Sequence, residues 1–324
     1  MVGRAGAAAP TPMVPIRIGV LTEMGGPYAE DSGRGSVAAV RFAVEDFRRQ
    51  QPGFAIELVS ADAQTKPDVA AAVAGAWYGR DGVDMIIDVP VSNCALAVAG
   101  VARSHDKVAI FNTSTSDLTG KACSPNHVHW AFDTYALSAS TAHAMLDDGG
   151  DTWFLIQADY TFGAVLAAEA AAVVQAGGGR VLGTVRHPFP GTTDFSSYLL
   201  AAQTSGAKVI GLANAGADAA NCIKQAAEFG LTRGGARLAA LQCLLPSIHG
   251  IGTEAAQGAL PYGVVLLGHG RGHPRVFRPF CPCHARHAAL YDPRRLLRGR
   301  AALPESGRLA RAKGRPRRRR CGRG

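Results

Sequence analysis

Short apolar runs alternate with longer amphipathic stretches through most of the chain. The runs are rich in β-branched residues, which is typical of strands buried in a parallel sheet. The stretches between them place apolar residues three or four apart, which is typical of helices with one buried face. The pattern predicts strands at 16–22, 54–60, 85–87, 108–111, 127–132, 153–157, 180–185, 209–213 and 238–242, and helices from about 36 and at 66–78, 93–103, 135–146, 161–176, 196–204 and 218–229.

This pattern contains two successive series of alternating strands and helices, with a linker near residue 130. Such series fold into α/β domains whose parallel sheets carry helices on both faces. We therefore expect two doubly wound, Rossmann-like lobes at 16–130 and 131–245, with 246–260 starting a return to the first lobe. Residues 1–15 are small and Pro-containing, and we expect a disordered remnant there. AGAAAP within them is similar to the end of a secretory signal, although no apolar central region precedes it.

Small polar residues directly follow two neighbouring predicted strands of the first lobe. Ser92 and Asn93 come after the run at 85–87, and Asn112, Thr113 and Ser114 come after the run at 108–111. The carboxyl ends of parallel strands share one edge of a sheet, where open α/β sheets bind small molecules. Ser92 or Asn93 would also cap the following helix, whose free N–H groups suit a carboxylate. Each segment alone is more typical of an ordinary cap or loop, but the pair favours half of a ligand site.

The second lobe repeats this arrangement. Asp159, Tyr160 and Phe162 follow the run at 153–157, and Asn214 and Gly216 follow the run at 209–213. Two such lobes facing each other would enclose a small ligand in the cleft between them. For the aromatic residues, packing at a helix start is an equally good interpretation, and Asn214 could simply be a cap.

The formal net charge of +9 is concentrated at one end of the chain. Residues 261–324 hold 17 of the 34 Lys and Arg residues and 2 of the 25 Asp and Glu residues. The remaining 260 residues are mildly acidic, so the overall charge is no argument for nucleic-acid binding, and we expect none. No run of 18 apolar residues occurs, so we expect no membrane insertion.

The motifs of several enzyme classes are missing from the sequence. There is no Gly-x-Gly-x-x-Gly after the first strand, no Walker-type phosphate loop and no Gly-x-Ser-x-Gly elbow. Cys281, Cys283, His284 and His287 lie close together, but their spacing matches no strong zinc pattern. We therefore expect no catalytic site, no cofactor and no metal, and an enzyme with a Rossmann-like fold is the less favoured alternative.

Several segments match one known family in their order and spacing. They are IRIGVLTEMGGPYAEDSGRGS at 16–36, SNCALAVA at 92–99, FNTSTSDLTG at 111–120, ADYTFG at 158–163 and NAGADAANCIKQAAEFGL at 214–231. On these segments the chain resembles the periplasmic solute-binding proteins of branched-chain amino-acid-type ABC transporters, the relatives of the leucine/isoleucine/valine-binding protein. The resemblance covers about residues 16–260. It implies the type I periplasmic binding protein fold, a periplasmic location, and a non-enzymatic protein that closes around its ligand and delivers it to a permease.

The resemblance also implies roles for the residues at the strand ends. Ser92 and Asn93 match the helix start that holds a ligand carboxylate, and the loop with Thr113 and Ser114 matches a second contact to that carboxylate. In the second lobe, Phe162 beside Tyr160 matches an aromatic wall, and 214–216 match the strand end that faces it.

One residue departs from the pattern of amino-acid binders. These proteins place an acid for the ligand ammonium near the end of the strand predicted at 238–242, where this chain has Gln242. A desolvated ammonium needs a partner of opposite charge. The ligand class therefore stays open between a branched-chain amino acid and an aromatic or other small carboxylate. The same bilobed fold also serves in ligand-sensing regulators of the amide-sensing type, which is the alternative function.

The tail at 261–324 is the second departure. In the family, this part of the chain returns to complete the first lobe, whereas here it is dominated by Arg, Pro, Gly, Cys and His without an amphipathic pattern. A frameshift in a GC-rich gene would produce such a composition, and a genuine basic arm is the alternative. We accordingly expect the C-terminal part of the fold to be incomplete.

Overall fold

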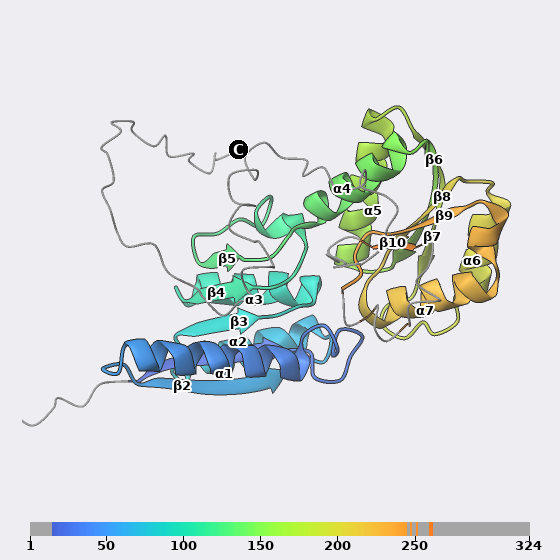
Figure 1. The fold of residues 1–324 in the computed structure, drawn as a ribbon. Coiled ribbons are helices and arrows are strands. Elements are labelled where there is room, and N and C mark those ends of the chain that lie inside the picture. Colours follow the sequence, from blue (N-terminus) through green and yellow to red (C-terminus); the bar gives the residue numbers. More distant parts are fainter. Residues whose placement is uncertain (1–14, 245–246, 248–250, 252–258, 262–324) are drawn as a thin grey trace, which may run out of the picture. The chain divides into compact units, whose positions relative to one another are not determined.

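The computed structural model describes residues 15–244, 247, 251 and 259–261 of the 324-residue chain. Within them the chain forms two five-stranded parallel sheets with helices packed against them (Figure 1). We call each sheet with its helices a lobe. The remnant expected before residue 15, the tail expected after residue 261 and the frameshift hypothesis concern residues outside this part.

The first sheet has the strand order β2-β1-β3-β4-β5. Its elements are β1 (Ile16–Thr22), α1 (Gly33–Gln50), β2 (Ile56–Asp62), α2 (Pro67–Gly79), β3 (Met85–Asp88), α3 (Ser92–Ser104), β4 (Val108–Phe111), the 3₁₀ helix η1 (Ser116–Leu118) and β5 (His127–His129). The chain moves outward from β1 to β2 and then back across β1 to β3. Right-handed crossovers therefore put α1 on one face of the sheet and α2 and α3 on the other. The direction reverses between β1 and β3, so a crevice opens at the carboxyl ends of these two strands.

The second sheet has the strand order β10-β9-β8-β6-β7, which is the same winding. Its elements are α4 (Thr134–Asp147), β6 (Thr152–Ala158), α5 (Thr161–Ala176), β7 (Arg180–His187), α6 (Ser196–Thr204), β8 (Val209–Ala213), α7 (Gly216–Glu228), the 3₁₀ helix η2 (Leu231–Gly234), β9 (Arg237–Ala240) and β10 (Ala259–Pro261). Here the direction reverses between β6 and β8. The two expected doubly wound lobes are confirmed, because both sheets are parallel and repeat one topology.

Local sequence explains how the helices come to pack on the sheets. Gly19, in β1, lies under the ring of Trp77 from α2, and a Cβ at Gly19 would come within 2.5 Å of that ring. Pro67 occupies the first turn of α2, where its missing N–H costs nothing. In the second sheet every residue of β8 is buried. A fully buried Leu or Ile side chain stabilises the fold by roughly 1.5–3 kcal/mol, so these strands supply much of the core energy.

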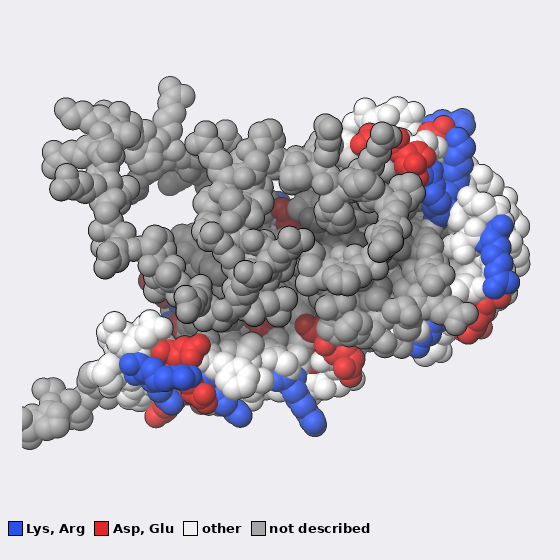
Figure 2. All heavy atoms as spheres, in the orientation of Figure 1, with Lys and Arg blue, Asp and Glu red and all other residues white. Residues whose placement is uncertain are grey.

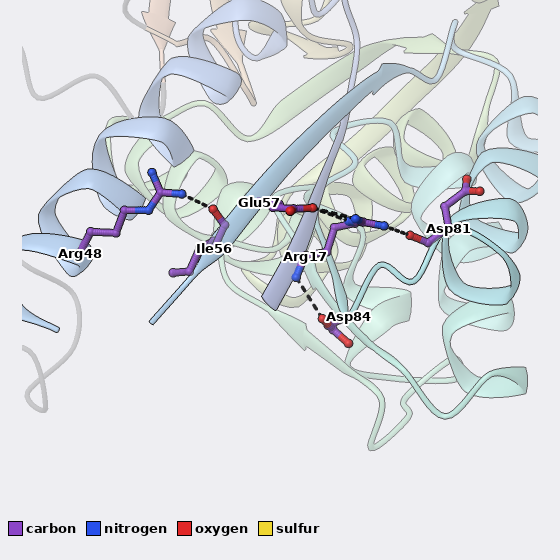
Figure 3. Close-up of polar contacts among 6 residues, drawn as sticks. All are labelled: Arg17, Arg48, Ile56, Glu57, Asp81 and Asp84. Atoms are coloured by element: carbon purple, nitrogen blue, oxygen red, sulfur yellow. Dashed lines mark hydrogen bonds and ion pairs between the residues drawn. The ribbon is translucent and has the colours of Figure 1, made fainter. Parts of the chain in front are cut away.

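Charged side chains hold the amino-terminal edge of the first sheet (Figure 3). Arg17 donates through Nε and Nη2 to Glu57 Oε2 at 3.0 and 2.7 Å, and through Nη1 to the Asp81 carbonyl oxygen. The backbone N–H of Arg17 donates to Asp84 Oδ2 at 3.0 Å and thereby lowers the pKa of that carboxyl. The Arg17–Glu57 ion pair is substantially exposed and contributes at most about 1 kcal/mol. The cluster secures the end of the sheet opposite to the carboxyl ends of the strands.

The predicted elements occur in the predicted order, and the differences lie at their ends. The first helix begins at Gly33 rather than near residue 36, and the last predicted helix begins at Gly216 rather than Asp218. Strand β9 ends at Ala240, so Gln242 lies beyond it. We expected residues 246–260 to start a return to the first lobe. The structure differs from this expectation at the end of the segment. Residues 259–261 pair in parallel with β9 and so continue the second sheet.

The described surface carries charges of both signs. On the face shown in Figure 2, Lys and Arg side chains of the described residues lie beside Asp and Glu side chains. Among the described residues, no helix is both long enough and apolar enough to cross a membrane.

Candidate functional site

A small cavity lies among strand ends of both lobes. Its volume is about 50 Å³. An enclosed water needs roughly 10–15 Å³, so the cavity has room for a few waters. The lining residues are Tyr28, Asp31, Ser32, Pro90, Ser92, Asn112, Thr113, Ser114, Ala131, Phe132, Tyr160, Phe162, Gln242 and Leu244.

The cavity brings together part of the predicted site. The predicted residues that line it are Ser92, Asn112, Thr113, Ser114, Tyr160 and Phe162. The predicted residues outside its lining are Asn93, Asp159, Asn214 and Gly216. The sequence reasoning missed Tyr28, Asp31 and Ser32, which follow β1. Since β1 lies next to β3 at the point where the winding reverses, the strand order would have indicated them.

The hydroxyl groups of Ser92 and Thr113 form a buried pair at the start of α3. Their oxygens are 3.0 Å apart, and the residues are 1% and 3% exposed. The prediction that Ser92 or Asn93 caps α3 is wrong, because the N-cap is Val91 and no side chain caps the helix. Ser92 already lies at the first helical position, so its hydroxyl points to Thr113 instead. Asn93 accepts a hydrogen bond of 3.1 Å from the adjacent Cys94 N–H.

The chain at the end of β3 and just after it has an unusual backbone conformation. Asp88 and Val89 have φ values of +91° and +51°, a region that non-glycine residues rarely adopt. Such residues cost about 1–3 kcal/mol each and concentrate at functional sites. Asn112 stabilises the turn, because its N–H donates to the Asp88 carbonyl oxygen at 2.8 Å and its side chain donates to Asp88 Oδ1 at 3.2 Å. Burial raises the pKa of Asp88. The turn places Pro90 and Ser92 in the lining of the cavity.

An aromatic group from both lobes forms another wall. The hydroxyl groups of Tyr28 and Tyr160 are hydrogen-bonded to each other. The ring of Tyr160 stacks on Phe189 with centroids 3.9 Å apart and lies 5.9 Å from the ring of Phe162. Burial raises the pKa of both tyrosines well above the usual range, so both stay neutral hydrogen-bonding groups.

Two further contacts join the lobes beside this wall. The Ser114 hydroxyl donates to Gln242 Oε1 at 3.0 Å. The carbonyl oxygen of Pro27 accepts a hydrogen bond of 3.1 Å from Ala217 N–H. Gly216 has a φ of +57°, and a Cβ there would lie 2.4 Å from the Pro27 oxygen. Gly216 therefore belongs to the contact between the lobes rather than to the cavity lining.

Asn214 lies in a buried polar cluster with His187 and Asp218. Its Nδ2 is 3.3 Å from His187 Nε2, while His187 Nδ1 is 3.8 Å from Asp218 Oδ2. Burial raises the pKa of Asp218 to about 7 and lowers the pKa of His187, so the two do not form a strong ion pair. Asp159 is exposed, and its backbone N–H donates to the His187 carbonyl oxygen at 2.9 Å.

Asp31 is the acidic side chain of the lining. Its Oδ1 accepts a hydrogen bond of 3.3 Å from Ser247, whereas its Oδ2 is buried and has no partner among the described residues. Burial raises the pKa of this carboxyl. Within the described residues no group of three or more His, Cys, Asp or Glu could hold a metal ion, and residues 281–287 lie outside them.

Comparison with known proteins supports this architecture. Residues 15–264 match the family described as periplasmic binding protein. A periplasmic binding protein from Burkholderia mallei is 44% identical, with a TM-score of 0.73 over 76% of this chain and 65% of that chain. A branched chain amino acid ABC transporter periplasmic ligand-binding protein from Burkholderia xenovorans LB400 is 38% identical, with a TM-score of 0.64 over 75% of this chain and 65% of that chain.

More distant structures share the fold alone. An ABC transporter solute binding protein from R. palustris, solved in complex with 4-hydroxybenzoate, is 23% identical, with a TM-score of 0.65 over 74% of this chain and 66% of that chain. A search of curated proteins found no match. The chain thus spans about two thirds of the length of the solved structures it matches.

Proposed function

Because this chain belongs to the periplasmic binding protein family, we propose that it captures a small carboxylate-bearing solute in the cavity between its lobes and delivers it to an ABC transporter permease. The proposed location is the periplasm, and the proposed role is binding without a catalytic step. The two Burkholderia relatives, at 44% and 38% identity, support the role in binding.

The buried Ser92–Thr113 hydroxyl pair is the observation that carries this proposal. Both residues line the cavity at the amino-terminal end of α3, where the helix dipole favours an anion. The two hydroxyls bond to each other, and each can turn its O–H toward a carboxylate oxygen. Hydrogen bonds to a charged acceptor are stronger than neutral ones, so the exchange favours an anionic ligand.

The aromatic part of the lining suits an apolar ligand body. Tyr160 and Phe162 from the second lobe, with Phe132, line the cavity. Aromatic and branched aliphatic groups pack well against such rings. The neighbours fit this class, since one is named as a branched-chain amino acid transport protein and another binds 4-hydroxybenzoate.

Titration calorimetry on the full chain tests the proposal. We expect small carboxylates with an aromatic or branched body to bind, and the corresponding primary amides to bind at least about tenfold more weakly because the hydrogen bonds lose their charge assistance. Ser92→Ala should weaken carboxylate binding. Ser104→Ala is the matched control, because this exposed hydroxyl bonds only within α3, to the Val101 carbonyl oxygen at 2.8 Å. Equal binding of acids and amides would contradict the proposal.

A further inference from the structure

Two titratable side chains of the second lobe, His187 and Asp218, are buried next to each other. They are 0% and 4% exposed, and His187 Nδ1 lies 3.8 Å from Asp218 Oδ2. The same Nδ1 lies 3.1 Å from the Pro188 carbonyl oxygen, while Nε2 lies 3.3 Å from Asn214 Nδ2. These contacts suit a neutral imidazole, because Nδ1–H then donates to the carbonyl oxygen and Nε2 accepts from the amide.

Asp218 also lies close to the contact between the lobes. It is in the first turn of α7, directly after Gly216 and Ala217. The N–H of Ala217 donates to the Pro27 carbonyl oxygen at 3.1 Å, and a Cβ at Gly216 would lie 3.0 Å from the ring of Tyr28. Burial raises the pKa of Tyr28, and the nearby carboxyl of Asp218 raises it further. The first lobe therefore forms part of the cover over Asp218.

Other titratable side chains lie around this pair, and burial keeps three of them neutral by raising their pKa values. The three are Tyr28 from the first lobe, Tyr160 at the start of α5 and Cys222 in α7. Tyr198 from α6 borders the imidazole with ring centroids 5.9 Å apart, and Asp159 after β6 is exposed. Burial lowers the pKa of His187, and the charge of Asp159 opposes this effect. Asp218 is therefore the group of this cluster that titrates near pH 7.

We propose that closure of the lobes takes up a proton at Asp218, so that ligand affinity falls as the pH rises through the neutral range. The inference rests on the proposed function and adds a regulation of the same site. With the lobes apart, Asp218 loses the cover of Pro27 and Tyr28, and water stabilises its charged form. With the lobes closed, the same carboxyl is desolvated, which raises its pKa from 3.8 to about 7.

Linkage between closure and protonation sets the direction and the size of the effect. The closed form holds the proton more tightly than the open form, so affinity is highest at low pH and falls by up to about tenfold per pH unit until pH 7. Above pH 7 both forms are charged and the affinity levels off. His187 packs on Phe195 of its own lobe, with ring centroids 4.9 Å apart, so separation of the lobes leaves it buried.

Titration calorimetry on the full chain tests the inference with benzoate, 4-hydroxybenzoate and 4-methylpentanoate as probes. Measurements between pH 6 and 8 in buffers of different ionisation enthalpy give the number of protons taken up per ligand bound. Carboxyl groups have ordinary pKa values of about 4, so the probes stay ionised and the proton enters the protein. We expect an uptake that approaches one proton at pH 6 and vanishes near pH 8, with affinity up to about tenfold higher at pH 6.

Variants then assign the proton. Asp218→Asn mimics the protonated acid, so it should bind without proton uptake and with the same affinity at every pH. Asp147→Asn is the matched control, because it removes the same charge from an exposed position of α4 and should keep the uptake. His187→Gln should also keep it. Infrared difference spectra of the wild type give a second readout, since uptake by a carboxylate produces the C=O band of a carboxylic acid when ligand is added at pH 6.

The outcomes separate the inference from the proposed function. If a carboxylate binds without proton uptake, or without the carboxylic acid band, the inference is overturned while the proposed function stands. The same holds if the uptake persists in Asp218→Asn or is lost in His187→Gln alone. If no carboxylate binds, both are overturned.

Discussion

The Ser114 hydroxyl donates a hydrogen bond of 3.0 Å to the side-chain carbonyl oxygen of Gln242 and joins the end of β4 to the chain that follows β9. The two residues are 5% and 9% exposed and belong to different lobes. This bond can form only when the lobes are in contact. It therefore stabilises the closed arrangement around the cavity rather than either lobe alone.

Ser114→Ala should weaken ligand binding without destabilising the lobes. In the closed form the Gln242 oxygen would be buried without a donor, which costs about 1–3 kcal/mol, or roughly 5- to 150-fold in affinity. With the lobes apart the same oxygen is solvated and nothing is lost. Calorimetry and denaturant unfolding measure the two effects. Ser140→Ala provides the control, because this hydroxyl bonds only within α4, to the Ala136 carbonyl oxygen at 2.7 Å and the Leu137 carbonyl oxygen at 3.2 Å.

Much of the fold could be predicted because the apolar runs and the turn residues that bound them indicate the same elements. The runs at 16–22 and 108–111 are bounded by turn and loop residues and became β1 and β4 with the predicted limits. The helix at 161–176 likewise has its predicted limits as α5. A parallel sheet buries its central strands on both faces, so a strand such as β8 is a continuous apolar run that is easy to recognise.

The site was harder to predict because it depends on strand order, which periodicity does not reveal. Reading strand ends along the sequence found Ser92 and Thr113, since these follow adjacent apolar runs. Asp31 lies nine residues beyond the end of β1, too far to be found by reading strand ends without the strand order. Asn214 follows β8 directly, yet it bonds to His187 and lies outside the cavity lining. A residue's distance from a strand end therefore does not determine which way its side chain turns.

Gly216→Ala should hold the lobes apart. The Cβ would meet the Pro27 oxygen at 2.4 Å, and overpacking of this kind costs about 1–3 kcal/mol. The added left-handed strain costs a further 1–2 kcal/mol or so. We expect ligand affinity to fall at least about tenfold, measured by calorimetry.

A matched glycine separates the clash from the strain. Gly178 has a φ of +82° and nothing within 4 Å of a Cβ, so Gly178→Ala carries the strain alone. Both variants should lower the free energy of unfolding, but only Gly216→Ala should weaken ligand binding. Equal ligand affinities in the two variants would argue against a closing contact at Gly216.

Asp218 should make the protein less stable as the pH rises from about 4 to 7. Burial raises its pKa from 3.8 to about 7, so over this window the unfolded chain loses a proton that the folded chain keeps. Stability from this group is complete below pH 4, falls by up to about 1.4 kcal/mol per pH unit and levels off above pH 7. Asp218→Asn should remove this slope and be more stable than the wild type at pH 7.5.

Denaturant unfolding at several pH values measures the difference between the two proteins. His187 contributes with the opposite sign, because its lowered pKa makes stability fall as the pH drops below its ordinary value of 6.5. The two contributions have opposite signs, so the sign of the difference between the two proteins identifies the contribution of Asp218. Asp147→Asn, at an exposed position of α4, should leave the pH dependence unchanged. A flat difference curve for Asp218→Asn would contradict the assignment.

Ser92 and Thr113 should act on the ligand as one unit. Ser92→Ala and Thr113→Val each remove one hydroxyl donor, and each should cost about 1.5–3 kcal/mol of binding free energy if both hydroxyls hold the same carboxylate. The double variant should then lose clearly less than the sum of the single losses, because a carboxylate without one partner gains less from the other. Calorimetry on the wild type, the two single variants and the double variant measures this coupling. Additive losses would show that the two hydroxyls bind separate groups of the ligand. Unchanged affinity in both single variants would show that the ligand carboxylate does not bind at this end of the cavity.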